Sequence, residues 1–233
     1  MTETLFRDDS YLRECEATVV SAGADGIVLD RTVFYPMGGG QPGDTGTLSW
    51  DGGEVEINDT RHGEAGAIRH LTDADATLPE AGTTVTARLD WDRRYLHMRM
   101  HTALHLLGSV LQYGVTGGNI SAAKSRLDFD MEDPVDKEQV TAGIQALVAA
   151  NHPLSCRWIS DEELDAQPEL VRTMSVQPPK GAGQVRLLEI EGVDLQPCGG
   201  THLNSTGEVG PVRVGKVEKK GRHNRRVSIV LDQ

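Results

Sequence analysis

Short apolar stretches separated by Gly, Asp and Pro fill the first ninety residues, and this pattern predicts strands rather than helices. Strands are expected in six segments, at 16–20, 26–35, 45–50, 54–58, 67–71 and 83–89. Turn residues at such short intervals are typical of an antiparallel barrel or sandwich. We therefore expect a small, mostly antiparallel β-barrel module in this part of the chain.

A helical pattern replaces the strand pattern in segment 92–114. Its apolar residues share one stripe, at Leu104, Leu107 and Leu111. Gly114 is expected to stop this helix. A second helix is predicted to start at Asp133-Pro134 and to end before Pro153. Its apolar face consists of Val140, Ile144, Leu147 and Val148.

Three further strands are expected near the end of the chain, at 187–191, 211–217 and 226–231. We place a domain boundary near residue 90, so that residues 1–90 form the β module and residues 91–233 form an α+β module. The predicted fold class is therefore α+β.

The acidic and basic residues are unevenly spread, although the net charge of the 233 residues is −12. Residues 1–90 hold six basic and 17 acidic side chains, whereas residues 91–233 hold 17 and 18. Segment 211–226 contains seven basic residues and one acid, Glu218. A nucleic-acid-binding protein is usually basic overall, so the total charge argues against that class and the local cluster keeps it open.

The sequence lacks the features of membrane and secreted proteins. No apolar run approaches the ~20 residues that a bilayer crossing needs, and the first residues carry acids where a signal peptide needs a basic and an apolar region. Three cysteines far apart do not indicate a disulfide framework, and Cys15 and Cys156 are interpreted as small buried residues. A soluble, cytoplasmic protein without a membrane partner is expected.

Two pairs of metal-ligating residue types stand about a hundred residues apart. His101 and His105 are one helical turn apart on the predicted helix, so that both imidazoles project from one face. Cys198 and His202 flank a Gly-Gly-Thr turn that can bend both side chains toward one point. Two His, one Cys and a further His form a donor set that suits Zn²⁺.

Other interpretations of these residues stay open. A His pair on a helix is more often packed or solvent-exposed than metal-bound, and the second pair with its Cys reverses that balance. His97 lies one turn before His101 and competes as a ligand. Thr102 stands where a metalloprotease HExxH motif has its glutamate, so that class is excluded.

A glycine-rich segment, 38–46, lies within the β module. Its sequence, GGGQPGDTG, indicates a loop that turns tightly or approaches another group closely. It lacks the Lys-Ser/Thr of a P-loop, and no helix follows it. A glycine-rich β-turn is the simpler interpretation.

Together these motifs resemble those of the alanyl-tRNA editing proteins, the AlaX family, and of the editing domain of alanyl-tRNA synthetases. The resemblance rests on GGGQPGDTG at 38–46, HTALHLL at 101–107, SRLDF at 125–129 and CGGTHLNSTGEVG at 198–210. The motifs stand in the family's order, and the N-terminal β module is similar to that of the medium-length type. No site for alanine activation is recognisable, so a complete synthetase is excluded.

The resemblance implies an α+β zinc-binding editing domain at 91–233 and a zinc-dependent deacylase of mischarged aminoacyl-tRNA(Ala). The seryl ester is the expected substrate, the glycyl ester is a second candidate, and alanyl-tRNA(Ala) is spared. By position, the family's roles as zinc ligands fall on His101, His105, Cys198 and His202. The family's glycine motif, which lies close to the editing pocket in this type, falls on Gly38, Gly39, Gly40 and Gln41.

Further residues are candidates for contact with the substrate. A pocket that hydrogen-bonds the serine hydroxyl would use polar side chains, and the candidates are Thr102, Thr116, Asn119 and Ser121. Each of these is also a plausible helix-face or loop residue. Gln41 is the polar residue of the glycine loop that we expect to be exposed and able to reach the ester or the terminal adenosine.

The basic segment 213–226 is expected to contact tRNA phosphates through Lys219, Arg222 and Arg225, or else to be a solvated edge strand.

The role of the zinc ion stays open. Four protein ligands would close a tetrahedral site, which is typical of structural zinc, so the metal could be catalytic or could organise the pocket. The alternatives to a deacylase are a non-catalytic, zinc-stabilised tRNA-binding module and a zinc hydrolase of another small ester or amide.

Overall fold

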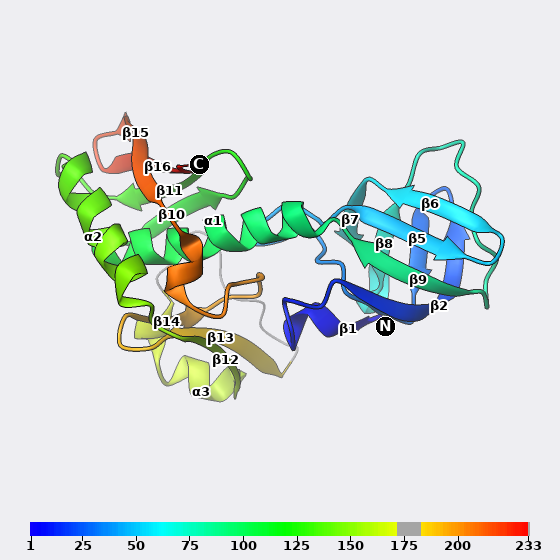
Figure 1. The fold of residues 1–233 in the computed structure, drawn as a ribbon. Helices are drawn as coiled ribbons and strands as arrows, with labels where there is room; N and C mark the ends of the chain where they lie inside the picture. Colours follow the sequence, from blue (N-terminus) through cyan, green and yellow to red (C-terminus); the bar gives the residue numbers. More distant parts are fainter. Residues whose placement is uncertain (172–182, 233) are drawn as a thin grey trace. The chain divides into compact units, whose positions relative to one another are not determined.

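The computed structural model describes residues 1–171 and 183–232, which form two compact units (Figure 1). The first unit comprises Met1–Leu96, and the second begins at His97. The division falls inside helix α1 (Trp91–Val110). The domain ranges predicted above, 1–90 and 91–233, stay a prediction. No helix in the described part of the chain is long and apolar enough to cross a membrane.

The first unit consists of strands with two 3₁₀ turns, η1 (Leu5–Arg7) and η2 (Glu64–Gly66). Its strands are β1 (Glu3–Thr4), β2 (Glu14–Gly23), β3 (Gly26–Leu29), β4 (Arg31–Thr32), β5 (Gly46–Trp50), β6 (Gly53–Ile57), β7 (Asp59–His62), β8 (Ile68–Leu71) and β9 (Thr84–Leu89). Seven of them form one antiparallel sheet in the order β6-β5-β9-β2-β3-β8-β7, and β1 pairs with β4.

The prediction of a β-barrel is wrong, because among the described residues the sheet does not close. A barrel requires its first and last strands to pair with each other. Here those strands are β6 and β7, which follow each other with only Asn58 between them. One continuous chain segment therefore forms both edges of the sheet, and among the described residues β6 pairs with β5 and β7 with β8, but not with each other. The unit is mixed in pairing and built on an open antiparallel sheet.

The core of the first unit lies on one face of this sheet. Strand residues alternate between buried and exposed, as the period of two requires. Its fully buried side chains include Ile27, Leu29, Phe34 and Leu48. The strand pattern of the sequence thus corresponds to a real apolar face, although β7 was not predicted.

Helix α1 is buried more widely than its sequence pattern indicates. Leu104 and Leu107 lie in the core as predicted, and so do Met98, Met100 and Leu106. The apolar pattern indicated a single stripe because the helix also buries polar side chains, such as His97 and Thr102, which such a pattern does not register. The helix ends at Val110, before the predicted stop at Gly114.

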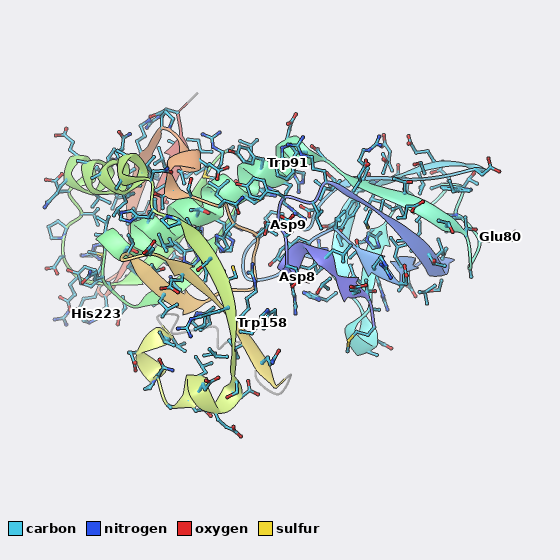
Figure 2. The ribbon with its side chains drawn as sticks, turned by 60° about the horizontal axis from the view of Figure 1, so that its bottom comes forward. Asp8, Asp9, Glu80, Trp91, Trp158 and His223 are labelled. Carbon is cyan, nitrogen blue, oxygen red and sulfur yellow. The ribbon has the colours of Figure 1, made fainter. Side chains whose placement is uncertain are left out.

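The second unit contains two antiparallel sheets. Their strands are β10 (Val115–Asn119), β11 (Ser125–Asp130), β12 (Leu154–Ser160), β13 (Gln184–Ile190), β14 (Asp194–Pro197), β15 (Val212–Gly221) and β16 (Asn224–Leu231). One sheet has the order β10-β11-β16-β15 and the other β12-β13-β14. The shorter elements are α3 (Asp161–Asp165), η3 (Pro168–Leu170) and η4 (Thr206–Val209). Figure 2 marks Trp158, which is 41% exposed, on β12.

Helix α2 (Lys137–Ala150) begins later than predicted. The Asp136 carboxylate accepts hydrogen bonds from the amides of Glu138 and Gln139, both at 3.0 Å, so Asp136 is the N-cap instead of Asp133. The helix contacts β15, where Thr141 Oγ1 accepts from the Val214 amide at 3.0 Å. All three cysteines are free thiols, and Cys156 is exposed on β12, contrary to the prediction that it is buried.

Candidate metal centre

Four side chains that lie far apart in the sequence meet in the second unit. They are His101, His105, Cys198 and His202, which we call the His/Cys cluster. One ligand atom from each residue lies within 4.8 Å of those of the other three. The Sγ atom of Cys198 is 3.5 Å from Nε2 of His101 and 3.1 Å from Nε2 of His202. This group could hold a metal ion.

Two separate elements supply the cluster. Helix α1 places His101 and His105 one turn apart on one face, with their ring centroids 5.3 Å apart. The turn that follows β14 supplies Cys198 and His202. The His101 and His202 rings lie 4.2 Å apart, so the turn brings its imidazole directly against the helix face.

Arg186, in β13, fixes the turn that carries Cys198. The amide of Cys198 donates to the Arg186 carbonyl at 3.0 Å. The buried Arg186 guanidinium donates through Nη1 to the carbonyls of Cys198, at 3.1 Å, and Gly200, at 2.9 Å. A turn rich in glycine has little stiffness of its own, so these bonds define where its thiol points.

The donor set and its spacing fit zinc. Zinc binds imidazole nitrogen at about 2.0–2.1 Å and thiolate at about 2.3 Å in a tetrahedron, which places neighbouring donors roughly 3.3–3.7 Å apart. Of the two Sγ···Nε2 distances, 3.5 Å lies within this range and 3.1 Å lies slightly below it. Three imidazoles and a thiolate are also the ligand types that this metal prefers.

The ring of His105 is oriented by a carboxylate. Its Nδ1 lies 3.1 Å from Oδ2 of Asp194, and Nε2 of Gln196 donates to the same oxygen at 2.6 Å. A proton on Nδ1 directed to Asp194 leaves Nε2 of His105 for the cluster. Carboxylate partners of this kind orient metal-binding histidines and increase their basicity.

The ring of His202 has a hydroxyl partner. Its Nδ1 lies 3.3 Å from Oγ1 of Thr102, and this oxygen also accepts from the Leu203 amide at 3.3 Å. Thr102, predicted as a candidate for contact with the substrate, is fully buried behind the ring. The hydroxyl holds His202 with its Nε2 toward Cys198.

The cluster shifts the pKa values of its members. Burial opposes ionisation of the Cys198 thiol, but the charges of His101 and His202 outweigh it, and the pKa of the thiol lies well below its usual value. Burial, together with the charge of His101, lowers the pKa of His202. A thiolate and a neutral imidazole are the forms that a metal binds.

His97 is not part of the cluster, although it is buried on the same helix one turn before His101. The sequence could not decide between His97 and His105 as the partner of His101, because each lies one helical turn from His101. The place where the Cys198 turn meets α1 decides which histidine joins the cluster. That place depends on the packing of β13 and β14.

The glycine-rich segment 38–46 forms a tight turn in the first unit. Gly38 and Gln41 exchange two backbone hydrogen bonds, of 3.1 and 2.9 Å, across Gly39 and Gly40. Both central residues have positive φ, +55° and +83°, which glycine adopts without strain. The prediction that Gln41 is exposed is wrong: its side chain is fully buried, because the turn folds it toward the unit.

The same segment contains a buried ion pair. Asp44 accepts from Nε of Arg94 at 2.9 Å and from Nη2, and the Arg94 guanidinium also donates to the carbonyls of Ser10 and Val33. Neither charged side chain is more than 1% exposed. The Asp of the motif therefore fastens the first turn of α1 to the glycine-rich segment.

The other candidate residues for contact with the substrate lie on or beside β10. Thr116 Oγ1 donates to the Asp128 carbonyl at 3.1 Å and accepts from the amide side chain of Asn224 at 2.8 Å. Asn119, at the end of β10, is exposed, and the Ser121 hydroxyl donates to the Lys124 carbonyl at 2.8 Å. Their predicted roles stay predictions.

The basic residues predicted to contact tRNA lie on the β15–β16 hairpin, whose turn is marked by His223 in Figure 2. Lys219 and Arg225 are cross-strand neighbours, and Arg222 is exposed in the turn. Nη1 of Arg225 donates to the carbonyls of the turn, at 3.2–3.3 Å. The hairpin thus presents a compact basic end.

Sequence reasoning missed Asp194, Gln196 and Arg186, which surround the ligands. Asp194 and Gln196 are two residues apart on β14, so the strand period places both side chains on the face of His105. This pair of an acid and an amide, shortly before the Cys198 motif, could have indicated partners of the ligands. The signal can be interpreted only once β14 is known to be a strand.

Comparison with family models places the chain among translation proteins. Residues 5–93 match the model of class II (A) tRNA synthetases, and residues 185–228 match that of the threonyl and alanyl tRNA synthetase second additional domain. The second match contains β14, the Cys198 turn and the basic hairpin. The His/Cys cluster thus lies in a chain that carries the second additional domain of these synthetases.

Whole-chain relatives define the family more narrowly. The chain is 37% identical to the alanyl-tRNA editing protein AlaX-M of Methanosarcina acetivorans, over 99% of both chains, and 38% identical to that of Methanosarcina mazei, over 100% of this chain and 98% of the relative. It is 35% identical to the alanine–tRNA ligase of Pyrococcus furiosus, over 94% of this chain but only 24% of the ligase. The chain belongs to the alanyl-tRNA editing protein family, AlaX-M type.

Proposed function

We propose that this protein is a trans-editing hydrolase, which cleaves the ester bond of mischarged aminoacyl-tRNA(Ala) and releases the amino acid and the tRNA. Its principal substrate is seryl-tRNA(Ala), with glycyl-tRNA(Ala) as a second candidate, and alanyl-tRNA(Ala) is spared. The observation that carries the proposal is the convergence of the His/Cys cluster in a chain of the alanyl-tRNA editing family.

Zinc is the proposed cofactor, one ion per chain, held by the four residues of the His/Cys cluster. When bound, zinc supplies a Lewis acid that polarises an ester carbonyl or lowers the pKa of a water molecule toward ~7. The donor types and the Sγ···Nε2 distances of 3.5 and 3.1 Å support this assignment.

The protein side chains mainly have to position groups, because an aminoacyl ester is already activated. Its hydrolysis requires an oriented water and stabilisation of the oxyanion more than a strong nucleophile. Asp194 orients His105, Thr102 orients His202, and Arg186 fixes the turn that carries Cys198. We propose that these three residues act on the reaction through the ligands they hold, without touching the substrate.

Selectivity for serine over alanine has a physical basis in the serine hydroxyl. A site built to hydrogen-bond a hydroxyl rejects the analogue without it by ~10⁴ or more, because its own polar groups are left unpaired. Thr116, Asn119 and Ser121 carry suitable side chains on β10 or just after it. The backbone of Gly38–Gln41 is proposed to take part in substrate binding, as the family's glycine motif does.

The basic end of the β15–β16 hairpin is proposed to contact tRNA phosphates through Lys219, Arg222 and Arg225. Phosphate contacts release counterions, so tRNA affinity is expected to fall steeply as the salt concentration rises. A salt response that is flat would place the tRNA on another surface.

One assay tests the proposed function. The protein is incubated separately with seryl-tRNA(Ala), alanyl-tRNA(Ala) and seryl-tRNA(Ser), and free amino acid is measured over time. Release of serine from the first substrate alone is the expected result. Binding of tRNA(Ala) without release would favour a non-catalytic zinc-stabilised module, and the absence of both would favour a hydrolase of another small ester.

A further inference from the structure

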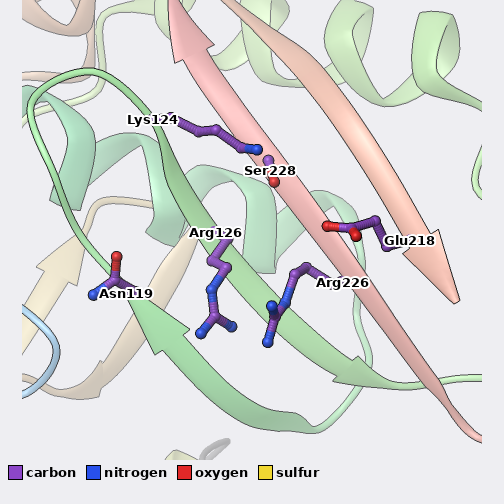
Figure 3. A pocket seen from close by; sticks show the side chains of 6 residues that line it. All are labelled: Asn119, Lys124, Arg126, Glu218, Arg226 and Ser228. Atoms are coloured by element: carbon purple, nitrogen blue, oxygen red, sulfur yellow. The ribbon is translucent and has the colours of Figure 1, made fainter. Parts of the chain in front are cut away.

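A polar hollow lies on the four-stranded sheet of the second unit, outside the His/Cys cluster. Its cavity volume is about 260 Å³. Six residues line it, namely Asn119, Lys124, Arg126, Glu218, Arg226 and Ser228. Figure 3 shows Asn119 and Glu218 at opposite edges, Lys124 and Ser228 between them, and the guanidinium groups of Arg126 and Arg226 directed to the same side.

The register of the strands explains why these side chains meet. Arg126 of β11 pairs with Asn119 on one side and with Ser228 of β16 on the other. In the neighbouring row Arg226 pairs with Glu218 of β15. Residues two apart on a strand share a face, so both rows lie on one face, while Phe129, Val227 and Ile229 are buried on the other.

The cations of the hollow exceed its anions. Asp128 binds Arg226 through two bonds, at 2.8 and 2.9 Å, and also binds Nη1 of Arg126 at 2.5 Å. One carboxylate therefore serves two guanidinium groups and holds both in place. No ion pair of Lys124 is found among residues 1–171 and 183–232, so this exposed ammonium adds a further positive charge.

Glu218 does not cancel this excess. Its carboxylate binds Lys216 at 3.0 Å and Lys220 at 3.4 Å, so it is already surrounded by two other cations. The hollow and its immediate neighbours therefore attract an anion, and the two guanidinium groups offer several N–H donors in fixed directions.

The floor of the hollow carries a buried hydroxyl that has no partner. Ser228 is fully buried, and within the described part of the chain its Oγ makes no hydrogen bond. A buried polar atom of this kind costs free energy unless water or a ligand satisfies it. Its place beneath the side chain of Lys124 gives an anion in the hollow both a charge and a hydroxyl donor.

We propose that this hollow binds one backbone phosphate of the tRNA, through Lys124, Arg126, Arg226 and the hydroxyl of Ser228. This assignment rests on the proposed function, which supplies the tRNA as partner. The hollow differs from the basic end of the hairpin, because its guanidinium groups are fixed by Asp128 and it includes a neutral donor. It would therefore hold a phosphate at a defined position.

Two variants and a matched control test the proposal. Lys124→Gln removes the exposed charge, and Ser228→Ala removes the hydroxyl; because that hydroxyl has no partner, its loss is not expected to destabilise the fold. The control is Lys137→Gln, which removes the same charge from an exposed position at the start of α2. Affinity for uncharged tRNA(Ala) is measured by filter binding over a series of salt concentrations. Ester hydrolysis is measured on two substrates, seryl-tRNA(Ala) and the serine ester of adenosine, and the second has no phosphate.

We expect Lys124→Gln to lower tRNA affinity about tenfold, the size of one charge-assisted hydrogen bond, and to reduce the slope of log affinity against log salt by about 1. Ser228→Ala should lower the affinity less and leave the salt slope unchanged. Hydrolysis of the adenosine ester should be the same in all four proteins.

The proposal is overturned if the two hollow variants bind tRNA as tightly as the Lys137→Gln control does. If the wild type edits normally in the same experiment, the proposed function stays intact. A wild type that hydrolyses neither ester would instead reject the proposed function. Titration with inorganic phosphate separates the remaining alternative: phosphate binding that Lys124→Gln abolishes, with unchanged tRNA affinity, would assign the hollow to free phosphate and overturn its assignment to RNA.

Discussion

Each unit of the protein buries a histidine, and the two differ in charge. His70 in the first unit is fully buried, with Nδ1 donating to the Ile27 carbonyl at 3.0 Å and Nε2 accepting from the Thr32 hydroxyl at 2.8 Å. Burial lowers the pKa of His70 to about 4, despite the opposing bond to Ile27. This ring is neutral, and both of its nitrogens are satisfied.

His105 in the second unit is also buried, but its neighbours are acidic. Burial favours the neutral ring, yet the hydrogen bond with Asp194 and the nearby Cys198 outweigh it and raise the pKa of His105 to about 9. The partners of a buried histidine, more than its burial, therefore decide its charge. Both ring nitrogens of His70 already have hydrogen-bond partners, whereas the His/Cys cluster surrounds a point where a cation is expected to bind.

The Arg94–Asp44 pair extends the contrast. It is a complete arrangement within the first unit, because a buried guanidinium meets a buried carboxylate and two carbonyls. The His/Cys cluster of the second unit instead brings four metal-binding side chains to one point, where a bound metal ion would take the place of the His105 proton. The first kind of cluster stabilises a fold, and the second is typical of metal binding.

The largest expected effect is on the first unit. Asp44→Ala leaves the Arg94 charge buried without a counter-ion, so we expect the free energy of unfolding to fall by about 3–5 kcal/mol. Urea denaturation followed by circular dichroism measures the change. The matched control is Glu14→Ala, which breaks the exposed pair with Arg88 and should cost less than about 1 kcal/mol. Equal effects of the two variants would contradict the structural role given to Asp44.

The second effect depends on pH and tests the neutral state of His70. Because the folded-state pKa of about 4 lies below the ordinary value of 6.5, the unfolded chain binds more protons between these values. The stability contributed by His70 is therefore complete above pH 6.5 and is lost as the pH falls toward 4, by roughly 3 kcal/mol.

His70→Gln provides the comparison, since glutamine does not titrate. Urea denaturation at pH 7 and at pH 4 should show that the wild type loses roughly 3 kcal/mol more than this variant between the two conditions. Parallel losses in the two proteins would show that the buried ring is not held neutral.

The third effect concerns the orientation of a ligand in the second unit. Asp194→Asn keeps the shape of the side chain but removes the charge that faces His105, so zinc affinity should fall about 10–100-fold. Competition with a fluorescent chelator measures this change. Glu191→Gln, an exposed carboxylate three residues earlier in the chain, is the control and should leave zinc affinity unchanged. An unaltered affinity in Asp194→Asn would remove that residue from the account.

Sequence patterns predicted the positions of several elements well. Strands β5, β9 and β16 and helix α1 all lie within or close to the expected segments. Strand β10 was missed because its sequence, VTGGN, contains two glycines and lacks an apolar face, and it forms through pairing with β11. The open edges of the first sheet were also missed, since contacts between distant parts of the chain decide which strands pair, and they place the successive strands β6 and β7 at opposite edges.

The candidate site shows the same limit. Spacing brought His101 and His105 together on one helix face, but it could not choose between His97 and His105 as the second ligand on the helix. The neighbours that orient the ligands, Asp194 and Arg186, come from strands whose contacts are long-range. Local spacing therefore predicts the ligands better than it predicts what holds them.

Zinc content and deacylation, measured on the same samples, test whether the His/Cys cluster holds a metal on which the activity depends. Wild type, Cys198→Ala and Cys156→Ala are purified, zinc is quantified by atomic absorption, and the rate of serine release from seryl-tRNA(Ala) is measured on the same samples. One zinc per chain and full activity are expected in the wild type and in Cys156→Ala, where the exchanged residue is exposed and lies outside the cluster. Cys198→Ala is expected to lose both the zinc and the activity, and full turnover by a zinc-free Cys198→Ala protein would contradict the proposed role of the metal.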